Sequence, residues 1–522
     1  MNRILSTLFA ALMALTVTAQ VVERHPRGRI EHVGQNCISS SASSDGTEGA
    51  LRRVGLRSTA PLPCTGSPHV PVILVQFSDM EFTVAETKQQ IQALYDSFFN
   101  AAAGVHPGQA NSTSYCSVRE YYRLQSGGAF TPVFEVFGPV TLSKGYAYYG
   151  ANKGSTRDYR IREFYSEACK LVAQEGISLD AFDNNDDDVI DFVFFIYAGE
   201  GENGCDDVNT IWPKEGTASL TVSYDGNDIC FGSYGCTNEL YDGLQDGIGC
   251  TIHELAHGLG LADHYDTQGT CYGMDYWDIM DAGCYQLDGH IPCTMTAYEK
   301  DFMGWKNLVT LATDESYHLT LYPMEEDGTA YKVVNAANAN EYLILENRQS
   351  IGLDEYMGLP FIDLLSSYQK NHGLMVTHID YSVSSWTQNI INAYSSRQRM
   401  TIVPADGTLI SSSDGKTVGW MKSLHDDLYP GDANVTTLTS HAAFTGGTFG
   451  QRVHNIVENA DGTITLDVTP ADQLTDIATP TATQPDNGNT IYTAAGQHVS
   501  TLQRGINIVR TPNGTIQKIF VR

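Results

Sequence analysis

The chain has 522 residues, of which 42% are hydrophobic, and this is the composition of a globular protein with more than one core. Its 31 basic and 61 acidic residues give a formal net charge of −30. Like charges repel, so this balance argues against nucleic acid or an anionic membrane as a partner. We therefore expect two or three domains that act on some other kind of partner.

The first 19 residues have the pattern of an export signal. Arg3 precedes an apolar run at 4–17, and small residues follow up to Ala19. The run is too short to span a membrane, and no later run reaches a spanning length. We expect residues 1–19 to be a signal peptide, and the protein to be secreted or held at the cell surface without a membrane-spanning segment.

A polar leader is expected at residues 20–65. It has few apolar residues, no helical or strand period, and a serine-rich stretch at 39–44. We interpret it as a propeptide or flexible leader. Arg52, Arg53 and Arg57 are either sites for a trypsin-like protease or solvated charges, and the sequence does not favour one interpretation over the other.

The globular part is expected to begin near residue 66. The β-branched run at 69–77 predicts a strand, and the apolar spacing at 84–99 predicts a helix. Ser117 and Glu120 have the spacing of a capping box, which predicts the start of a second helix. Further predicted elements are strands at 134–137 and 140–142 and a helix at 159–174.

An acidic segment comes next, directly before an apolar run at 192–197 that predicts a buried strand. Its candidate cation ligands are Asp183, Asn185, Asp187 and Asp191. Oxygen side chains at alternate positions match the start of a calcium-binding loop, and adjacent carboxylates repel one another without a cation. Asp188, however, stands where that loop has glycine, and the last position of the loop lacks its glutamate. We predict calcium here and keep a solvated acidic turn as the alternative.

Residues 199–248 are rich in glycine and cysteine, which predicts loops with short strands. The chain has 11 cysteines. Those closest to the motif described next are Cys205, Cys230, Cys236, Cys250, Cys271, Cys284 and Cys293. Export permits disulfides, and no paired C-x-x-C pattern points to a cysteine-bound metal. We therefore expect disulfide bonds around this motif, with at least one thiol left over because the count is odd.

The chemistry of the chain concentrates in His253, Glu254 and His257, which form an H-E-x-x-H motif. On a helix predicted over 249–261, the two histidines lie a turn apart on one face and can bind a single metal ion. Glu254 is displaced around the helix, so it can act on a metal-bound water instead. Gly260 lets the chain leave the helix sharply and return with a third ligand.

Two residues compete for that third position. Asp263 stands where the metzincin pattern H-E-x-x-H-x-x-G-x-x-H has its last histidine, and His264 follows it. We predict Asp263 as the zinc ligand and keep His264 as the alternative. Met280 lies where metzincins have the methionine turn that supports the metal, and Tyr285, just beyond it, is a candidate donor to the developing oxyanion.

These motifs resemble those of the immune inhibitor A family of secreted bacterial metallopeptidases. The resemblance rests on the motif helix with Asp263, on the Tyr-Trp-Asp-Ile-Met segment at 276–280 and on residues 300–305. It extends to the segments 72–79, 117–122, 342–349 and 373–380, and thus over residues 66–470. It implies an α+β fold, in which a metzincin-like zinc peptidase domain has a twisted sheet and an active-site helix and acts on proteins or peptides.

The rest of the large globular part is expected to be rich in strands. We place the catalytic domain at 66–310, a β-rich continuation at 311–470, and a linker of Thr, Pro, Asp and Asn at 471–489. An acidic loop at 426–432 is a weaker cation candidate. The predicted strands of the continuation are 317–322, 331–334, 341–346, 374–378 and 400–403.

The last segment, residues 490–522, has the pattern of short strands, and we expect a small β-sandwich-like module. It resembles the C-terminal sorting domains of the type IX secretion pathway. That resemblance implies the secretion machinery as a partner. An accessory module without this role is the alternative.

The sequence as a whole predicts a secreted zinc-dependent endopeptidase. We expect Glu254 to act as the general base on a water that the zinc activates. The alternatives are a non-catalytic surface-binding protein on a peptidase scaffold, against which the intact motif argues, and a zinc hydrolase of glycan or small amide bonds. A further hypothesis makes the protein a zymogen, in which the leader brings a thiolate of Cys37 or Cys64 to the metal. The alternative is that these two cysteines form disulfide bonds.

Overall fold

The computed structural model describes residues 60–471, except 111, 176–179, 206, 225, 270, 413–419 and 439–440, and beyond them residues 490–493, 498–499, 502–511 and 516–521. The expected signal peptide and nearly all of the expected leader and linker lie outside the described residues. Within the described part, no helix combines the length and apolarity needed to cross a membrane. The chain divides into a large unit, residues 1–313 and 317–468, and a small unit, residues 314–316 and 469–522.

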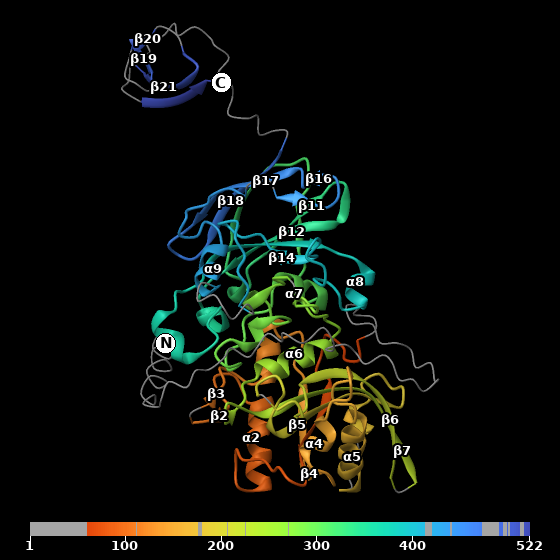
Figure 1. Cartoon of the computed structure of the whole chain (residues 1–522). Helices are drawn as coiled ribbons and strands as arrows, with labels where there is room; N and C mark the ends of the chain where they lie inside the picture. The colour runs from red at the N-terminus through yellow and green to blue at the C-terminus, as the bar shows by residue number, and fades with distance from the viewer. Residues whose placement is uncertain are drawn as a thin grey trace. The chain divides into compact units, whose positions relative to one another are not determined.

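The large unit begins with a sheet in the strand order β4-β1-β5-β7-β6 (Figure 1). Its strands are β1 (His69–Gln76), β4 (Val133–Thr141), β5 (Val189–Glu200), β6 (Lys214–Tyr224) and β7 (Asn227–Tyr241), with β8 (Leu244–Gln245) beside β7. β1, β4, β5 and β7 pair in parallel, whereas β6 and β8 pair antiparallel to β7. The unit is therefore a mixed α/β fold whose first sheet is mainly parallel, with an antiparallel strand at one edge.

Helices cover both faces of this sheet, which is why its inner strands are apolar along nearly their whole length. α2, α3 and α6 cover the face that carries Val70, Val72 and Leu74 of β1. α4 and α5 cover the opposite face, with Ile73 and Val75. The helices are α2 (Lys88–Asn100), α3 (Val118–Gln125), α4 (Tyr146–Gly150), α5 (Ile161–Gln174) and α6 (Gly249–Gly258).

The segment predicted as loops with short strands, 199–248, instead contains the long hairpin of β6 and β7. Its glycines are needed because aromatic rings pack directly on the backbone. A Cβ at Gly235 would lie 2.8 Å from the ring of Phe194, and a Cβ at Gly216 would lie 2.7 Å from the hydroxyl of Tyr234. Glycine here therefore indicates close packing in a buried sheet rather than an irregular loop.

The helix starts show which local signals decide the fold. The hydroxyl of Ser117 accepts a hydrogen bond from the N–H of Glu120 at 3.1 Å, as the predicted capping box requires. The Glu120 carboxylate pairs with Arg123 instead, at 2.6 Å, so only half of that box forms. α2 begins later than predicted because Thr87 and Gln90 form a full capping box.

The β-rich region forms further sheets, with strand orders β14-β13-β12-β11-β9 and β10-β18-β17. One face of β12 carries Leu343 and Leu345, which pack toward β10, β17 and β18. The opposite face carries Ile344, which shares a core with Ala262 and Trp277 near the motif helix. The strands are β9 (Val309–Thr310), β10 (Tyr317–Leu321), β11 (Tyr331–Asn335), β12 (Asn338–Arg348), β13 (Gly373–Asp380), β14 (Met400–Ile402), β17 (Gln451–Glu458) and β18 (Ile464–Pro470).

The motif helix α6 thus lies between two sheets of the large unit. Figure 1 shows α6 and α7 (Ala297–Met303) between the first sheet and the strands β11–β14. The remaining short elements are β2 (Gly108–Gln109), β3 (Ser112–Thr113), β15 (Ala442–Ala443), β16 (Gly447–Thr448), α8 (Val383–Thr387), α9 (Trp420–Asp427), η2 (Asp180–Phe182), η3 (Asp275–Trp277), η4 (Ala282–Tyr285), η5 (Met324–Glu326), η6 (Gly352–Tyr356) and η7 (Ile362–Ser367).

The small unit contains a four-stranded antiparallel sheet in the order β20-β19-β21-β22. Its strands are β19 (Thr490–Thr493), β20 (His498–Val499), β21 (Gly505–Arg510) and β22 (Ile516–Val521). The short strands are where the sequence predicts them. The residues described here form a single sheet, whereas the sequence predicted a sandwich-like module.

Candidate metal centre

Helix α6 carries the H-E-x-x-H motif and ends sooner than predicted. It covers Gly249–Gly258, and every residue in it is buried. Gly260 then adopts a φ of 101°, a conformation that glycine tolerates and most other residues do not. This turn reverses the chain, and the N–H of Leu261 donates to the carbonyl of Ala256 at 3.1 Å. The residues after the turn are therefore held against the helix that carries the motif.

The turn brings Asp263 to the two histidines. Its Oδ1 atom lies 3.3 Å from Nε2 of His253 and 3.2 Å from Nε2 of His257. The two imidazole planes stand at 88° to each other, so the rings approach this point from different directions. All three side chains are buried. Three atoms that can bind a metal ion therefore converge in a space closed to solvent.

Whether a metal ion fits here depends on the hydrogen bonds of Nδ1, the ring nitrogen on the side opposite Asp263 in both histidines. Nδ1 of His253 lies 2.7 Å from the carbonyl of Ile279, and Nδ1 of His257 lies 2.8 Å from the carbonyl of Leu261. A carbonyl only accepts, so each Nδ1 carries the proton and each neutral ring turns the lone pair of Nε2 toward Asp263. Three lone pairs this close repel one another unless a cation lies among them. The residues present fit a metal ion, and two histidines with one carboxylate are a ligand set of zinc.

Asp263 is held from a distant part of the chain. The amide of Asn389 donates to Oδ2 of Asp263, and the N–H of Asp263 donates to Oδ1 of Asn389 at 2.8 Å. Burial alone would raise the pKa of Asp263, but in the metal-free protein His257 and His253 can take up protons at Nε2, and as cations they outweigh burial and hold that pKa well below its usual range. The carboxylate is therefore ionised, as a metal ligand must be. The motif search missed Asn389 because no spacing relates it to α6.

His264, the alternative ligand, belongs to a different buried group. Its Nδ1 donates to Oδ2 of Asp278 at 2.8 Å, and Glu299 completes the group. Burial lowers the pKa of His264 to about 4 and raises the pKa of Asp278 to about 7. The residue that lies beside both motif histidines is therefore Asp263, one position earlier in the chain.

The methionine-turn segment contacts the centre mainly through its backbone. The carbonyl of Ile279 accepts from His253, and the carbonyl of Met280 accepts from the N–H of His264 at 2.9 Å. The side chain of Met280 is fully buried and packs in the same core as Leu255 of α6. Tyr285 ends η4 and is partly exposed, and its role as an oxyanion donor stays a prediction.

Glu254 is buried next to the ligands, with a relative exposure of 2%. Burial raises the pKa of its carboxyl group, while His253 and His257 act in the opposite direction without cancelling it. Lys214 of β6 also lowers this pKa, but its ammonium group forms an ion pair with the fully buried Asp158. The net result is a pKa of Glu254 above the usual range of a glutamate.

The predicted disulfides around the motif are absent among the cysteines that the structure describes. Several of these thiols serve as core residues instead. Cys169 and Cys236 lie in the core on one face of the first sheet, and Cys116 and Cys293 lie in the core on the other. Burial raises the pKa of all four, that of Cys236 to about 12. They are packed as neutral thiols.

The thiol of Cys64 is not where the latency hypothesis requires it. Its Sγ donates to the carbonyl of Leu259 at 3.6 Å and lies 3.6 Å from the sulfur of Met303. It therefore contacts the residue that ends α6 and is not one of the grouped metal-binding side chains. Cys37, the other candidate, lies outside the described residues.

The predicted calcium loop has part of the expected geometry. Asp188 adopts a φ of 63°, so it takes the backbone conformation for which calcium loops use glycine. The Asp183 carboxylate accepts from the N–H groups of Asp187 and Asp188 at 3.1 and 2.8 Å. Asp191 accepts from the amide of Asn185 at 2.9 Å. The carboxylates do not form one of the compact groups that could share an ion, and calcium stays a prediction.

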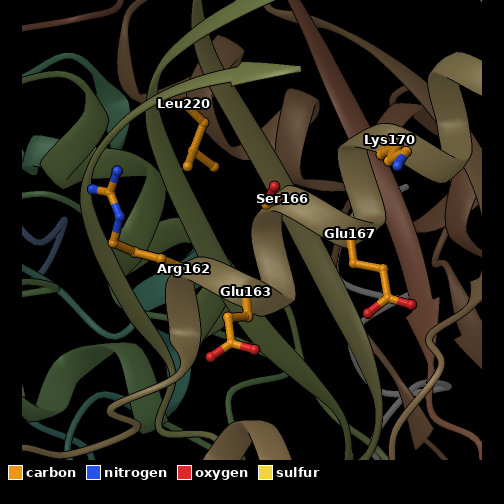
Figure 2. Close-up of a pocket in the computed structure, with 6 residues that line it drawn as sticks. All are labelled: Arg162, Glu163, Ser166, Glu167, Lys170 and Leu220. Carbon is orange, nitrogen blue, oxygen red and sulfur yellow. The ribbon is translucent and has the colours of Figure 1, made fainter. Parts of the chain in front are cut away.

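A second acidic loop and a surface pocket lie elsewhere. His425, Asp426 and Asp432 come close together near α9, but they are partly or fully exposed. Figure 2 shows a pocket on α5, between the side chains of Glu163, Glu167 and their neighbours, with Leu220 of β6 beside them. α5 covers the sheet face opposite α6, so this pocket is separate from the metal centre.

The comparisons with known proteins place the metal centre in a segment that is similar to a metallopeptidase domain. Residues 65–308 match the model of the immune inhibitor A peptidase M6 catalytic domain. The matched segment is similar to this family, the one that the motifs resemble. It is 28% identical over 277 residues to the pre-pro-metalloprotease PrtV of Vibrio cholerae serotype O1, a match that covers 45% of this chain and 29% of PrtV. It is 29% identical over 232 residues to immune inhibitor A of Bacillus thuringiensis subsp. alesti, covering 37% of this chain and 33% of that protein. The chain thus spans about a third of the length of these relatives.

Proposed function

We propose that the chain is a secreted zinc-dependent endopeptidase, with His253, His257 and Asp263 as the zinc ligands and Glu254 as the general base. The observation that carries the proposal is the convergence of the two Nε2 atoms on Oδ1 of Asp263, at 3.2 and 3.3 Å, in a segment that is similar to the M6 peptidase catalytic domain. Protein or peptide chains are the proposed substrates. The signal peptide, calcium in the loop at 183–191 and export through the C-terminal module are parts of the same proposal.

His253, His257 and Asp263 would hold the zinc ion, which when bound would act as a Lewis acid that lowers the pKa of a coordinated water to ~7 and polarises the scissile carbonyl. Two neutral histidines and one carboxylate would leave the centre with a net charge of about +1. The carbonyls of Ile279 and Leu261 fix both rings through Nδ1, so little reorganisation is needed when the metal binds.

Glu254 transfers the proton in the proposed reaction. One of its carboxylate oxygens accepts a proton from the attacking water, and Glu254 then donates this proton to the nitrogen of the leaving amine. Its raised pKa favours the first step, because a more basic carboxylate accepts the proton of the water more readily. Met280 supports the centre by packing against α6, and Tyr285 is the proposed additional donor to the oxyanion.

In the zymogen part of the proposal, the leader at 20–65 holds the enzyme latent through a thiolate on the metal or, where the cysteines form disulfide bonds, by lying across the active site. The Cys64 thiol is engaged near the end of α6, so a thiolate block of the metal would have to come from Cys37. This part of the proposal predicts that proteolytic removal of the leader raises activity. A thiol-reactive mercurial should leave a proprotein with Cys37→Ser unchanged.

The experiment that tests the function compares Glu254→Gln with the wild type on a mixed peptide library, with zinc content measured in both. The variant should keep its zinc and lose activity by about 10²–10⁴-fold. Glu163→Gln on α5 is the matched control and should leave turnover unchanged, because this exposed carboxylate lies on the sheet face opposite α6, where it accepts from the hydroxyl of Tyr148 and pairs with Arg160. Near-normal turnover of zinc-loaded Glu254→Gln would contradict the assignment, and a zinc-loaded wild type without any cleavage would favour the binding-protein alternative.

A further inference from the structure

A residue from outside the segment that matches the family model reaches into the metal centre. Asn389 lies 126 positions after Asp263, in the β-rich region, and its relative exposure is 4%. Its side chain makes a two-point contact with Asp263: the amide donates to Oδ2, and Oδ1 accepts from the backbone N–H at 2.8 Å. Both the side chain and the backbone of Asp263 are thus bound by one residue.

The position of Asn389 is set by the end of helix α8. Its own N–H donates to the carbonyl of Trp386 at 3.1 Å, and the N–H of Ile390 donates to the carbonyl of Ser385 at 2.9 Å. These bonds close the helix and put Asn389 at a φ of 54°. Asparagine adopts this left-handed conformation more readily than most residues. The backbone therefore aims the amide in one direction.

Helix α8 is itself anchored to the segment around the motif. Trp386 is buried, and its ring lies 6.3 Å from that of Tyr298 on α7. The hydroxyl of Thr267, four residues after Asp263, donates to the carbonyl of Asn389 at 3.4 Å. Because both ends of the contact are fixed in one core, the Asn389–Asp263 pair is a rigid link.

We propose that Asn389 is a positioning residue of the metal centre, one that holds Asp263 so that only Oδ1 faces the two histidines. This inference rests on the proposed function, because it assigns Asp263 as a metal ligand. The amide occupies Oδ2, which leaves Oδ1 as the metal-binding atom and excludes rotation of the carboxylate. Without the amide, Oδ2 would be buried without this donor, and the carboxylate could turn away from the histidines.

The inference extends the catalytic unit beyond residue 308, where the match to the family model ends. The ligands come from one short stretch of the chain, but the group that orients the third ligand comes from the β-rich region. Outer-shell partners of this kind change metal affinity by about 10–100-fold when they are removed. Asn389 would therefore make the β-rich region contribute a side chain to the metal centre.

Two substitutions test the inference in the full chain. Asn389→Gly keeps the left-handed backbone and removes both hydrogen bonds to Asp263. Asn389→Asp keeps the size and the acceptor but replaces the amide donor by an oxygen that repels Oδ2. The matched control is Asn347→Ala, because Asn347 is also fully buried and donates two hydrogen bonds, to the carbonyls of Leu321 and Gly462, at 2.9 and 2.8 Å.

The readout is the zinc dissociation constant, measured by competition with a chromogenic chelator, together with the melting temperature of each metal-free protein. We expect zinc affinity to fall by about 10–100-fold in both Asn389 variants and more in Asn389→Asp than in Asn389→Gly. Asn347→Ala should lower the melting temperature and leave the zinc affinity unchanged.

The outcomes separate this inference from the function on which it rests. A wild type that binds zinc, with either folded Asn389 variant binding it equally well, would overturn the positioning role alone. A wild type that binds no zinc would overturn the proposed function and the positioning role together. If Asn389→Gly does not fold, the near-isosteric Asn389→Asp decides the question by the same measurement.

Discussion

Two buried groups of histidine and acidic residues lie in neighbouring parts of the chain: His253, His257 and Asp263 form the first, and His264, Asp278 and Glu299 form the second. The two groups differ in the hydrogen bonds that their histidine rings make. In the first, His253 and His257 donate through Nδ1 to backbone carbonyls and turn their lone pairs toward Asp263. In the second, Nδ1 of His264 donates directly to Asp278. The second group can therefore neutralise its charges with hydrogen bonds, whereas the first needs a cation. The hydrogen bonds on the far side of a histidine ring, and not the residue types, distinguish a metal centre from a polar core.

The surroundings of the second group support this contrast. Burial raises the pKa of Glu299 well above its usual range, so this carboxyl group binds a proton more readily than an exposed glutamate does. Burial is also the largest influence on Asp278, and Arg348 partly opposes it. Arg348 is itself fully buried and pairs with Asp354 at 2.9 Å and Glu346 at 3.2 Å. In the second group, proton binding and the guanidinium group of Arg348 offset the negative charge of the carboxylates. In the first group, we propose that a metal ion does so.

The largest expected effect comes from replacing Asp263, the proposed third metal ligand. Asp263→Ala should lose zinc by more than the ~10–100-fold that outer-shell changes produce, because it removes a ligand itself. His264→Ala should keep the metal and lose about 1–3 kcal/mol of stability, because the buried Asp278 loses its donor. Zinc content after dialysis and urea unfolding of both variants provide the data. Zinc loss in His264→Ala combined with zinc retention in Asp263→Ala would reverse the assignment.

The next prediction replaces Arg348, the buried cation that lowers the pKa of Asp278 in the second group. Arg348→Met should destabilise the protein by about 3–5 kcal/mol, because it leaves Glu346 and Asp354 buried without their partner. Arg397→Met is the control, since its ion pair with Asp380 involves a side chain that is 42% exposed and should contribute less than about 1 kcal/mol. Urea unfolding measures both. Equal effects of the two substitutions would mean that the buried network contributes little.

Far from the motif, the buried His378 contacts the partly buried His441. His378 lies 3.1 Å from Glu341 through Nε2 and 2.8 Å from Nε2 of His441 through Nδ1. Burial, reinforced by His378, lowers the pKa of His441 to about 4. The unfolded chain therefore binds more protons between pH 6.5 and 4, and stability should fall by up to about 3 kcal/mol as the pH drops through this window.

The test of this pair is the pH dependence of urea unfolding. His441→Gln should flatten the decline of stability between pH 6.5 and 4, because glutamine does not titrate. His318→Gln, at a histidine whose side chain is 74% exposed, should leave the decline as it is in the wild type. A decline that is equally steep in His441→Gln and the wild type would show that this pair of histidines does not produce it.

The exposed acidic loop gives the smallest expected effect. If the loop at 183–191 binds calcium, the folded state gains about 2.7 kcal/mol at a calcium concentration 100 times the dissociation constant. The melting temperature of the zinc-loaded protein should therefore rise with calcium, and Asp183→Asn with Asp187→Asn should abolish the rise. Asp461→Asn, in an exposed turn of the β-rich region, is the control. A melting curve that is the same at every millimolar calcium concentration would favour the solvated acidic turn.

The helical part of the proposed site could be predicted from the sequence alone. The spacing of His253 and His257 and the place of Glu254 follow from helical geometry, which one sequence reveals. The choice between Asp263 and His264 does not follow from spacing, because the chain has left the helix at Gly260. It depends on Asp278, which gives His264 a partner of its own.

Other features depended on contacts that a pattern does not encode. Asn389 reaches Asp263 across 126 positions, and a single amide after a short helix has no periodic signature. The β6–β7 hairpin was predicted as loops because its glycines were taken as breaks, although an Asp-Gly pair between the strands is a strong hairpin signal. The thiols were expected to form disulfides because export permits them, and in the described residues they pack as apolar side chains instead.

The most direct test of the account is a crystal structure of the protein with anomalous diffraction data collected on both sides of the zinc absorption edge. The account predicts one strong zinc peak bonded to Nε2 of His253, Nε2 of His257 and Oδ1 of Asp263, with Asn389 still on Oδ2. A zinc peak among His264, Asp278 and Glu299, or no peak beside the motif histidines in protein purified with zinc, would contradict it.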